Sequence, residues 1–380
     1  MNLQRCASRQ IIVATVAALS LPIVLACADD GPAHRQDQQF PISLGTSGGN
    51  INDRTKAFCY GGTLGALVQD ANKAQYILSN NHVLARTNAA KLGEDIIQPG
   101  LIDQSPVCAQ DSSDAVADLS AFVSIKFKGK GAIPTNTVDA AIAQVRPNKV
   151  DSSGRIIDIG VISNATVEPA IGLAVKKSGR TTGLTSGSIS AVDVTVDVSY
   201  GSGKTARFVN QILVTPGSFI DGGDSGSLMV EDLDPMPRAV GLLFAGSSSV
   251  AIANPIDDVL NEFHVTMVTS LTTSLTHKIF NWAKNLFGVS ESHAASAQLP
   301  SFVNPAAMEA VRKVKLRHEA SLLSVPGVIG VGIGQSERLP SQAAIEVYVK
   351  EPAGVMRSQL PSSVDGVEVK IVETGEIHAY

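Results

Sequence analysis

The sequence predicts a mainly β protein built from short antiparallel strands. Hydrophobic residues make up 44% of the 380-residue chain, which is enough for buried cores, whereas only 17% of the residues are charged. Segments rich in Val, Ile, Ser and Thr are separated by short stretches that hold Gly, Pro, Asn or Asp, and no long helical period interrupts residues 56–255. This pattern favours a β-sandwich or β-barrel over a parallel sheet with crossover helices.

Residues 1–28 have the layout of a secretory signal peptide. Two arginines without any acid precede the apolar run IIVATVAALSLPIVLA, which is short for a membrane span. The sequence Ala-Cys-Ala fits cleavage before Asp29, and VLAC also resembles a lipobox in which Cys27 carries lipid. We expect export from a bacterial cell, as a secreted or periplasmic protein or one anchored to a membrane through Cys27. A plain apolar helix is the alternative, and the polar stretch that follows argues against it.

Charge and cysteine content limit which ligands and crosslinks the sequence predicts. The formal net charge is −5 and no basic run is present, so the sequence does not predict binding to nucleic acid. Outside the export segment only Cys59 and Cys108 remain, and in an oxidising compartment this pair is expected to form one disulfide. The chain has no C-x-x-C or H-E-x-x-H motif and no Cys/His cluster, so we expect neither a metal nor a cofactor. The oligomeric state stays open.

The chain divides by composition into a tether and a β domain. Residues 29–55 are polar and glycine-rich and are expected to form a flexible N-terminal segment. Residues 56–265 should form the main domain, which ends in a helix at IDDVLNEF. Its expected strands lie within residues 62–69, 75–79, 121–129, 138–147, 186–200, 206–216 and 239–256.

Two further units follow the β domain. Residues 266–300 should hold a helix and a small, polar linker, because five apolar residues recur at steps of three or four. These residues are Leu271, Leu275, Ile279, Trp282 and Leu286. We favour a helix docked on its own protein over a membrane-surface or partner helix. Residues 301–380 should form a small α+β domain, with a ferredoxin-like arrangement as one option, beginning with a helix capped by Asn304. The segment GVIGVGIG reads as a buried strand, since it has neither a P-loop lysine nor a complete G-x-G-x-x-G.

The stretch GGDSGS places Ser225 inside a glycine-rich corner. A serine hydroxyl needs a base within hydrogen-bond reach and donors for the oxyanion that forms at the attacked carbonyl. A corner of this kind can direct the backbone N–H groups of Gly223 and Ser225 at one point. Taken alone, the tetrapeptide is equally consistent with an ordinary turn.

Two other segments supply the partners that such a serine needs. His82 follows an apolar strand in YILSNNHVLA, and Asp139 stands at the entry of the apolar run VDAAIAQV, where a carboxylate must be hydrogen-bonded. Each could instead be an ordinary turn residue. Together with Ser225 they fall in the order His, Asp, Ser along the chain.

With these motifs the sequence resembles a chymotrypsin-like (trypsin-superfamily) serine peptidase of the bacterial secreted type. The matching pieces are GTLGALV, LSNNHVLA, VDAAIA, SGRTTGLTSGSI, GDSGSL and VGLLFAGS, within residues 59–260. The resemblance implies two antiparallel β-barrels with the site in the cleft between them. It also implies the catalytic roles: Ser225 as nucleophile, His82 as general base and acid, Asp139 as the group that orients the imidazole, and Gly223 and Ser225 as the oxyanion hole.

The carboxylate of Asp224 should be buried beneath this corner and therefore needs a cationic partner. The segment SGRTTG resembles the bacterial branch of the family, and this resemblance implies an Arg180–Asp224 pair that needs no cut N-terminus. A solvated hairpin arginine is the alternative for Arg180.

The substrate pocket is expected to lie near Phe219, Phe244 and Gly246. Since Phe219 replaces an acid at the expected floor, the pocket should be shallow or apolar rather than specific for Lys or Arg. The predicted function is an exported serine endopeptidase that acts on peptide or protein substrates through an acyl-enzyme. The alternatives are a binding or scaffold protein on a peptidase fold, and a latent or self-processing protease.

Overall fold

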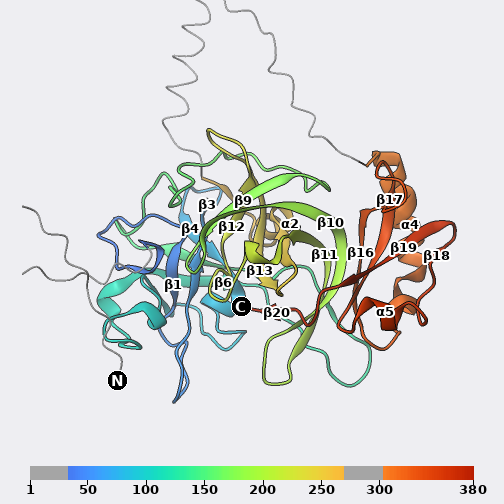
Figure 1. Ribbon diagram of the computed structural model, residues 1–380. Coiled ribbons are helices and arrows are strands. Elements are labelled where there is room, and N and C mark those ends of the chain that lie inside the picture. Colours follow the sequence, from blue (N-terminus) through green and yellow to red (C-terminus); the bar gives the residue numbers. More distant parts are fainter. Residues whose placement is uncertain (1–32, 269–302) are drawn as a thin grey trace, which may run out of the picture. The chain divides into compact units, whose positions relative to one another are not determined.

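The computed structural model describes residues 33–268 and 303–380, whose strands form two large sheets (Figure 1). This part of the chain is mainly β, as the sequence predicted. Its α-helices are α1 (Asn81–Leu84), α2 (Ile256–Phe263), α4 (Pro305–Leu323) and α5 (Ala353–Met356). Short 3₁₀ turns lie at Ala33–Arg35, Leu101–Asp103, Ser112–Asp114 and Gly217–Phe219.

The first sheet has the strand order β15-β3-β4-β8-β6-β5-β1-β2. Its strands are β1 (Thr46–Asn50), β2 (Gly62–Leu64), β3 (Ala66–Gln69), β4 (Gln75–Ser79), β5 (Asp95–Ile97), β6 (Ala115–Phe122), β8 (Ala141–Val145) and β15 (Thr266–Met267). β2 and β3 lie near opposite ends of this order, yet only Gly65 separates them in the chain. The predicted strand 62–69 is therefore one bent segment that curls the sheet back on itself around an apolar core.

The prediction of a flexible segment over residues 29–55 is wrong for its described part. The glycine-rich stretch TSGGN forms β1, whose five residues are buried and which pairs with both β2 and β5. Gly48 is needed for packing rather than for mobility, because a Cβ there would lie 2.4 Å from a carbon of Leu64. Composition alone cannot separate these two uses of glycine.

The second sheet contains the remaining strands. They are β7 (Thr135–Asn136), β9 (Ala174–Gly179), β10 (Gly183–Ser199), β11 (Thr205–Thr215), β12 (Leu228–Glu231), β13 (Ala239–Gly246), β14 (Ala251–Pro255), β16 (Val328–Gln335), β17 (Ala343–Val349), β18 (Ser363–Val364), β19 (Val367–Glu373) and β20 (His378–Ala379). The long strand β10 pairs with β9 over its first part and with β16 over its second part, and bulges interrupt its pairing with β11 and β16. The strands after residue 301 thus continue the sheet of the β domain (Figure 1).

Residues 303–380 contribute helices and strands in the order α4, β16, β17, α5, β18, β19 and β20. The predicted helix cap is formed, since the side chain of Asn304 accepts a hydrogen bond from the N–H of Ala306 at 2.9 Å. The ferredoxin-like option is wrong, because β17 and β19 are parallel neighbours and β16 pairs with β10 instead of closing a separate sheet.

Some predictions lie outside the described residues. These are the signal peptide, the lipid site at Cys27, and the apolar helix and linker within residues 269–302. Among the residues that the structure describes, no helix is long and apolar enough to cross a membrane.

Candidate active site

His82 and Asp139 meet because they lie at the same end of two paired strands. β4 and β8 are antiparallel neighbours with Ser79 opposite Ala141, so the residues just after β4 lie beside those just before β8. His82 Nδ1 is 2.6 Å from Asp139 Oδ2, and the backbone N–H of His82 donates to Asp139 Oδ1 at 3.2 Å. The carboxylate thus orients the imidazole through two contacts.

The Asp139 carboxylate has no exposed surface, and polar groups surround it. The hydroxyl of Tyr200 donates to Asp139 Oδ2 at 2.7 Å, and the backbone N–H of Asp139 donates to Asn254 Oδ1 at 3.1 Å. Tyr200, which follows the end of β10, was not predicted from the sequence. No pattern in the sequence marks it, because its role depends on the distant end of a 17-residue strand.

The environment of His82 favours its charged form. Burial by itself lowers the pKa of the imidazole, but the charge and hydrogen bond of Asp139 and a hydrogen bond to the Tyr380 carbonyl outweigh it, so the pKa is raised. The phenol of Tyr200 has a pKa well above its usual range, because it is buried and lies against the Asp139 carboxylate. Tyr200 is therefore a neutral donor.

Ser225 lies in a tight corner between Gly223 and Gly226, which have φ angles of +96° and +92°. A Cβ on Gly226 would lie 2.3 Å from the Thr63 carbonyl oxygen, so both φ and space require glycine there. Ser225 Oγ donates to the Phe244 carbonyl at 3.2 Å, and among the described residues it has no hydrogen bond to His82. In the same set, the backbone N–H groups of Gly223 and Ser225 have no acceptor. These two donors are available for an oxyanion.

The first sheet holds the serine corner in place. The N–H of Thr63 in β2 donates to the Ser225 carbonyl at 2.8 Å, and the Thr63 hydroxyl donates to the Gly223 carbonyl at 3.0 Å. Gly65 packs so closely that an added Cβ would lie 1.8 Å from the Gly226 carbonyl oxygen. The corner thus connects the two sheets.

The predicted Arg180–Asp224 pair is wrong. The ammonium of Lys177 lies 3.2 Å from Asp224 Oδ2, and both side chains are fully buried. Arg180 instead binds Asp103, with Nε–Oδ2 and Nη2–Oδ1 distances of 2.5 and 2.7 Å. Lys177 lies within β9, whereas Arg180 follows the last residue of that strand, so the two side chains reach different partners.

Backbone and hydroxyl donors complete the surroundings of Asp224. It accepts hydrogen bonds from the N–H groups of Thr181, Thr182 and Asp221 and from the Thr182 hydroxyl, at 2.7–3.1 Å. Burial lowers the pKa of Lys177, and the Asp224 carboxylate opposes that effect. A lysine inside the strand AVKKSG was the sequence signal for this partner.

The three predicted pocket residues have different surroundings. Phe219 is fully buried, and Phe244 turns its ring into the core, 4.8 Å from the ring of Phe208. Gly246 faces an aromatic ring, since an added Cβ there would lie 3.1 Å from Tyr380 Cε2. The predicted disulfide Cys59–Cys108 is formed, with its Cα atoms 5.8 Å apart, at the edge of the first sheet.

Tyr380 lies in the middle of the site. Its carbonyl oxygen accepts a hydrogen bond from His82 Nε2 at 2.9 Å. Ala379 and Tyr380 also line a pocket of about 460 Å³ with Asp53, His82 and Tyr200. Burial raises the pKa of Asp53 to about 6.

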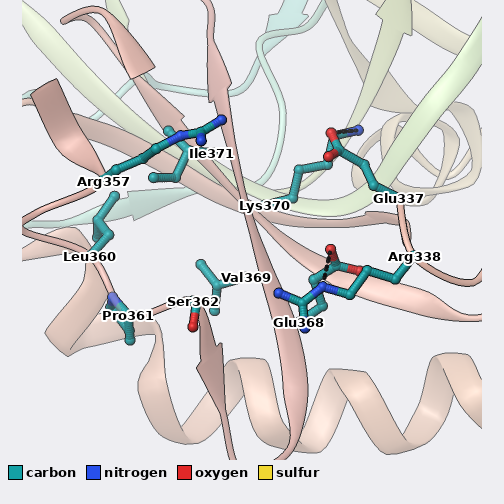
Figure 2. Close-up of a pocket in the computed structure, with 10 residues that line it drawn as sticks. All are labelled: Glu337, Arg338, Arg357, Leu360, Pro361, Ser362, Glu368, Val369, Lys370 and Ile371. Carbon is teal, nitrogen blue, oxygen red and sulfur yellow. Dashed lines mark ion pairs between the residues drawn. The ribbon is translucent and has the colours of Figure 1, made fainter. Parts of the chain in front are cut away.

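A second pocket lies among residues 337–371 (Figure 2). Figure 2 shows Arg338 beside Glu368 and Lys370 beside Glu337, pairs whose N–O distances are 3.4 and 3.9 Å. These ion pairs neutralise two of its cations, and its lining holds no nucleophile with a base. In the described ranges, no group of three or more His, Cys, Asp or Glu side chains could hold a metal ion.

The described residues have a trypsin-like peptidase fold: two curled, mainly antiparallel sheets, one presenting His82 and Asp139 and the other presenting Ser225. The family described as the Nal1 C-terminal domain matches residues 121–254. None of the curated proteins matches the chain significantly.

Several solved bacterial proteases are similar to the chain at low identity. A glutamic acid-specific serine protease that uses a histidine triad in substrate binding is 22% identical with a TM-score of 0.40, over 60% of this chain and 100% of its own. Thermobifida fusca protease A and Cellulomonas bogoriensis chymotrypsin are each 17% identical with a TM-score of 0.39, over 60% of this chain and 99% of their own.

Proposed function

We propose that the protein is a serine endopeptidase that cleaves peptide bonds through an acyl-enzyme. The observation that carries this proposal is the buried carboxylate of Asp139, 2.6 Å from His82, at the junction where the corner of Ser225 offers two unpaired N–H groups. A buried acid, an oriented imidazole, a hydroxyl and a pair of free donors are the four parts that acyl transfer needs.

In this reaction Ser225 Oγ attacks the scissile carbonyl while His82 Nε2 removes its proton. The carboxylate of Asp139 stabilises the resulting imidazolium, and the N–H groups of Gly223 and Ser225 stabilise the oxyanion. His82 then protonates the leaving amine, and water releases the acyl group by the same steps. A rotation about χ1 turns the Ser225 hydroxyl from Phe244 toward His82, which is a change between staggered rotamers.

An exported peptidase with peptide or protein substrates is consistent with this chemistry. The signal-like residues 1–28 support export, and a lipid at Cys27 would anchor the protein to a membrane. The disulfide supports an oxidising compartment.

Labelling with a fluorophosphonate probe tests the proposal, because the probe reacts only with an activated serine. Wild type should label at Ser225, whereas Ser225→Ala and His82→Ala should not. Ser249→Ala is the matched control, since Ser249 is an exposed serine outside the corner. Removal of any triad member should lower peptide turnover by about 10⁴-fold. The absence of label on folded protein that lacks residues 378–380 would refute the proposal.

A further inference from the structure

The segment of residues 377–380, which we call the tail, crosses from the last unit into the candidate site. The Ile377 side chain is fully buried among core residues of the β domain. The Ile377 carbonyl accepts a hydrogen bond from the N–H of Ser199 at 2.9 Å. Figure 1 shows β20 leaving the other strands of residues 303–380 and running toward β13. The tail is thus anchored at its start and extended beyond it.

Beyond Ile377 the tail pairs with the last two residues of β13, past the residues of that strand that pair with β12. His378 lies opposite Gly246 and Ala379 lies opposite Ala245, in antiparallel register. An extended peptide that binds a sheet edge gains backbone hydrogen bonds in the same way. The tail therefore has the main-chain geometry of a bound peptide beside the two β13 residues that follow Phe244, whose carbonyl accepts the hydrogen bond of Ser225.

The ring of Tyr380 occupies a slot with glycine walls. Cβ atoms added to Gly246 and Gly222 would lie 3.1 and 4.0 Å from carbons of this ring. The ring also packs against the apolar cluster that contains Phe219 and Ile220. Two glycines leave room for a flat side chain, so the slot suits an aromatic residue of an occupying peptide.

The tail also uses the group that catalysis needs. The Tyr380 carbonyl accepts the hydrogen bond of His82 Nε2, while the Ser225 hydroxyl turns to Phe244. Ser225 has no exposed surface in this arrangement. In this arrangement His82 is hydrogen-bonded to the tail and Ser225 is buried, so the site is inactive.

We infer that the tail occupies the acyl side of the substrate groove as an internal product mimic, with Tyr380 in the pocket for the residue before the scissile bond, and that its withdrawal is needed for activity. This inference rests on the proposed endopeptidase function. The substrate class that fits the same slot is an extended peptide with an aromatic residue at that position. A tethered ligand has an effective concentration on the order of millimolar. A tail with a dissociation constant of about 0.1 mM would then leave about one site in ten open.

The test compares second-order labelling rates with a fluorophosphonate probe. Deletion of residues 378–380, which keeps the anchor Ile377, should raise the rate about tenfold, and so should Tyr380→Asp, which places a charge beside Asp221. Tyr380→Phe should keep the low rate, because the ring remains. Glu376→Gln is the matched control, since that half-exposed side chain pairs with Lys350 outside the groove. Equal rates in wild type and the deletion variant, with Ser225 labelled in both, would overturn the inference.

A binding experiment separates this inference from the proposed function. A fluorescent His-Ala-Tyr peptide should bind the deletion variant that also carries Ser225→Ala, and should not bind the full-length Ser225→Ala protein. A His-Ala-Asp peptide should bind neither. If no variant labels, the endopeptidase proposal fails. Peptide binding still tests whether the tail occupies the groove. Equal binding to both proteins, or no binding to either, would contradict the inference that the tail occupies the groove.

Discussion

The ammonium of Lys177 lies 3.2 Å from Asp224, and neither side chain has exposed surface. The Lys177 ammonium also contacts the Thr182 hydroxyl and donates to the Gly183 carbonyl at 3.0 Å. This buried pair stabilises the serine corner, because Asp224 lies between Gly223 and Ser225, the residues whose N–H groups are the two oxyanion donors. The cation that stabilises the corner is therefore Lys177 of β9, in the same sheet.

Lys177→Met should destabilise the protein strongly, because it leaves a buried carboxylate without its cation. The expected loss is about 3–5 kcal/mol in the free energy of unfolding, measured by urea denaturation. Lys350→Met is the control, since the half-exposed Lys350 pairs with the half-exposed Glu376, and its effect should be about 1 kcal/mol or less. A loss for Lys177→Met no larger than that of the control would contradict this role.

Tyr200→Phe should lower kcat/KM by about tenfold, because it removes one hydrogen bond to the charged Asp139. Without this donor the carboxylate attracts the His82 proton more strongly, so the acid limb of the pH–rate profile should move to higher pH. Tyr76→Phe, at a partly exposed tyrosine of β4 outside the pocket, is the control. A fall in activity with an unmoved acid limb would indicate a packing role only.

The pH dependence follows from the raised pKa of His82. Activity needs neutral imidazole, so it should rise with pH through a midpoint above about 6.5, the usual value. The charged His82–Asp139 pair stabilises the fold fully below pH ~6.5, and this contribution is lost as pH rises through the folded-state pKa. Stability and activity should thus change in opposite directions, which denaturation and rate profiles would measure together.

Removal of the tail should lower that midpoint, because the hydrogen bond to the Tyr380 carbonyl is one cause of the raised pKa. Asp53, whose pKa is about 6, titrates beside the same pocket, so the comparison should be repeated with Asp53→Asn. A midpoint that stays in place in both backgrounds would contradict the contact between the tail and His82.

Gly65→Ala should disturb the serine corner from the opposite sheet. The added methyl would lie 1.8 Å from the Gly226 carbonyl oxygen, and overpacking of this kind costs about 1–3 kcal/mol. Probe labelling of the folded Gly65→Ala protein should also be lower than that of wild type. Gly129→Ala, where an added Cβ meets nothing within 4 Å, should leave stability and labelling unchanged.

Local patterns in the sequence predicted several elements correctly. The strand 75–79 is β4, the helix at IDDVLNEF is α2, and the cap at Asn304 is formed. These elements depend on alternation and on capping chemistry, which act within a few residues. The glycine-rich β1 was mistaken for a tether because Gly48 is explained only by Leu64 on a neighbouring strand.

The sequence by itself determined the residue types of the site, since a Gly-Asp-Ser-Gly corner, a histidine after a strand and an aspartate before one are local features. Only the tertiary structure decided which groups complete it: Lys177 rather than Arg180 beside Asp224, Tyr200 on Asp139, and Tyr380 on His82. The physical reason is that strand direction and face, set by pairing between distant segments, determine where a side chain points, and no local pattern carries that information.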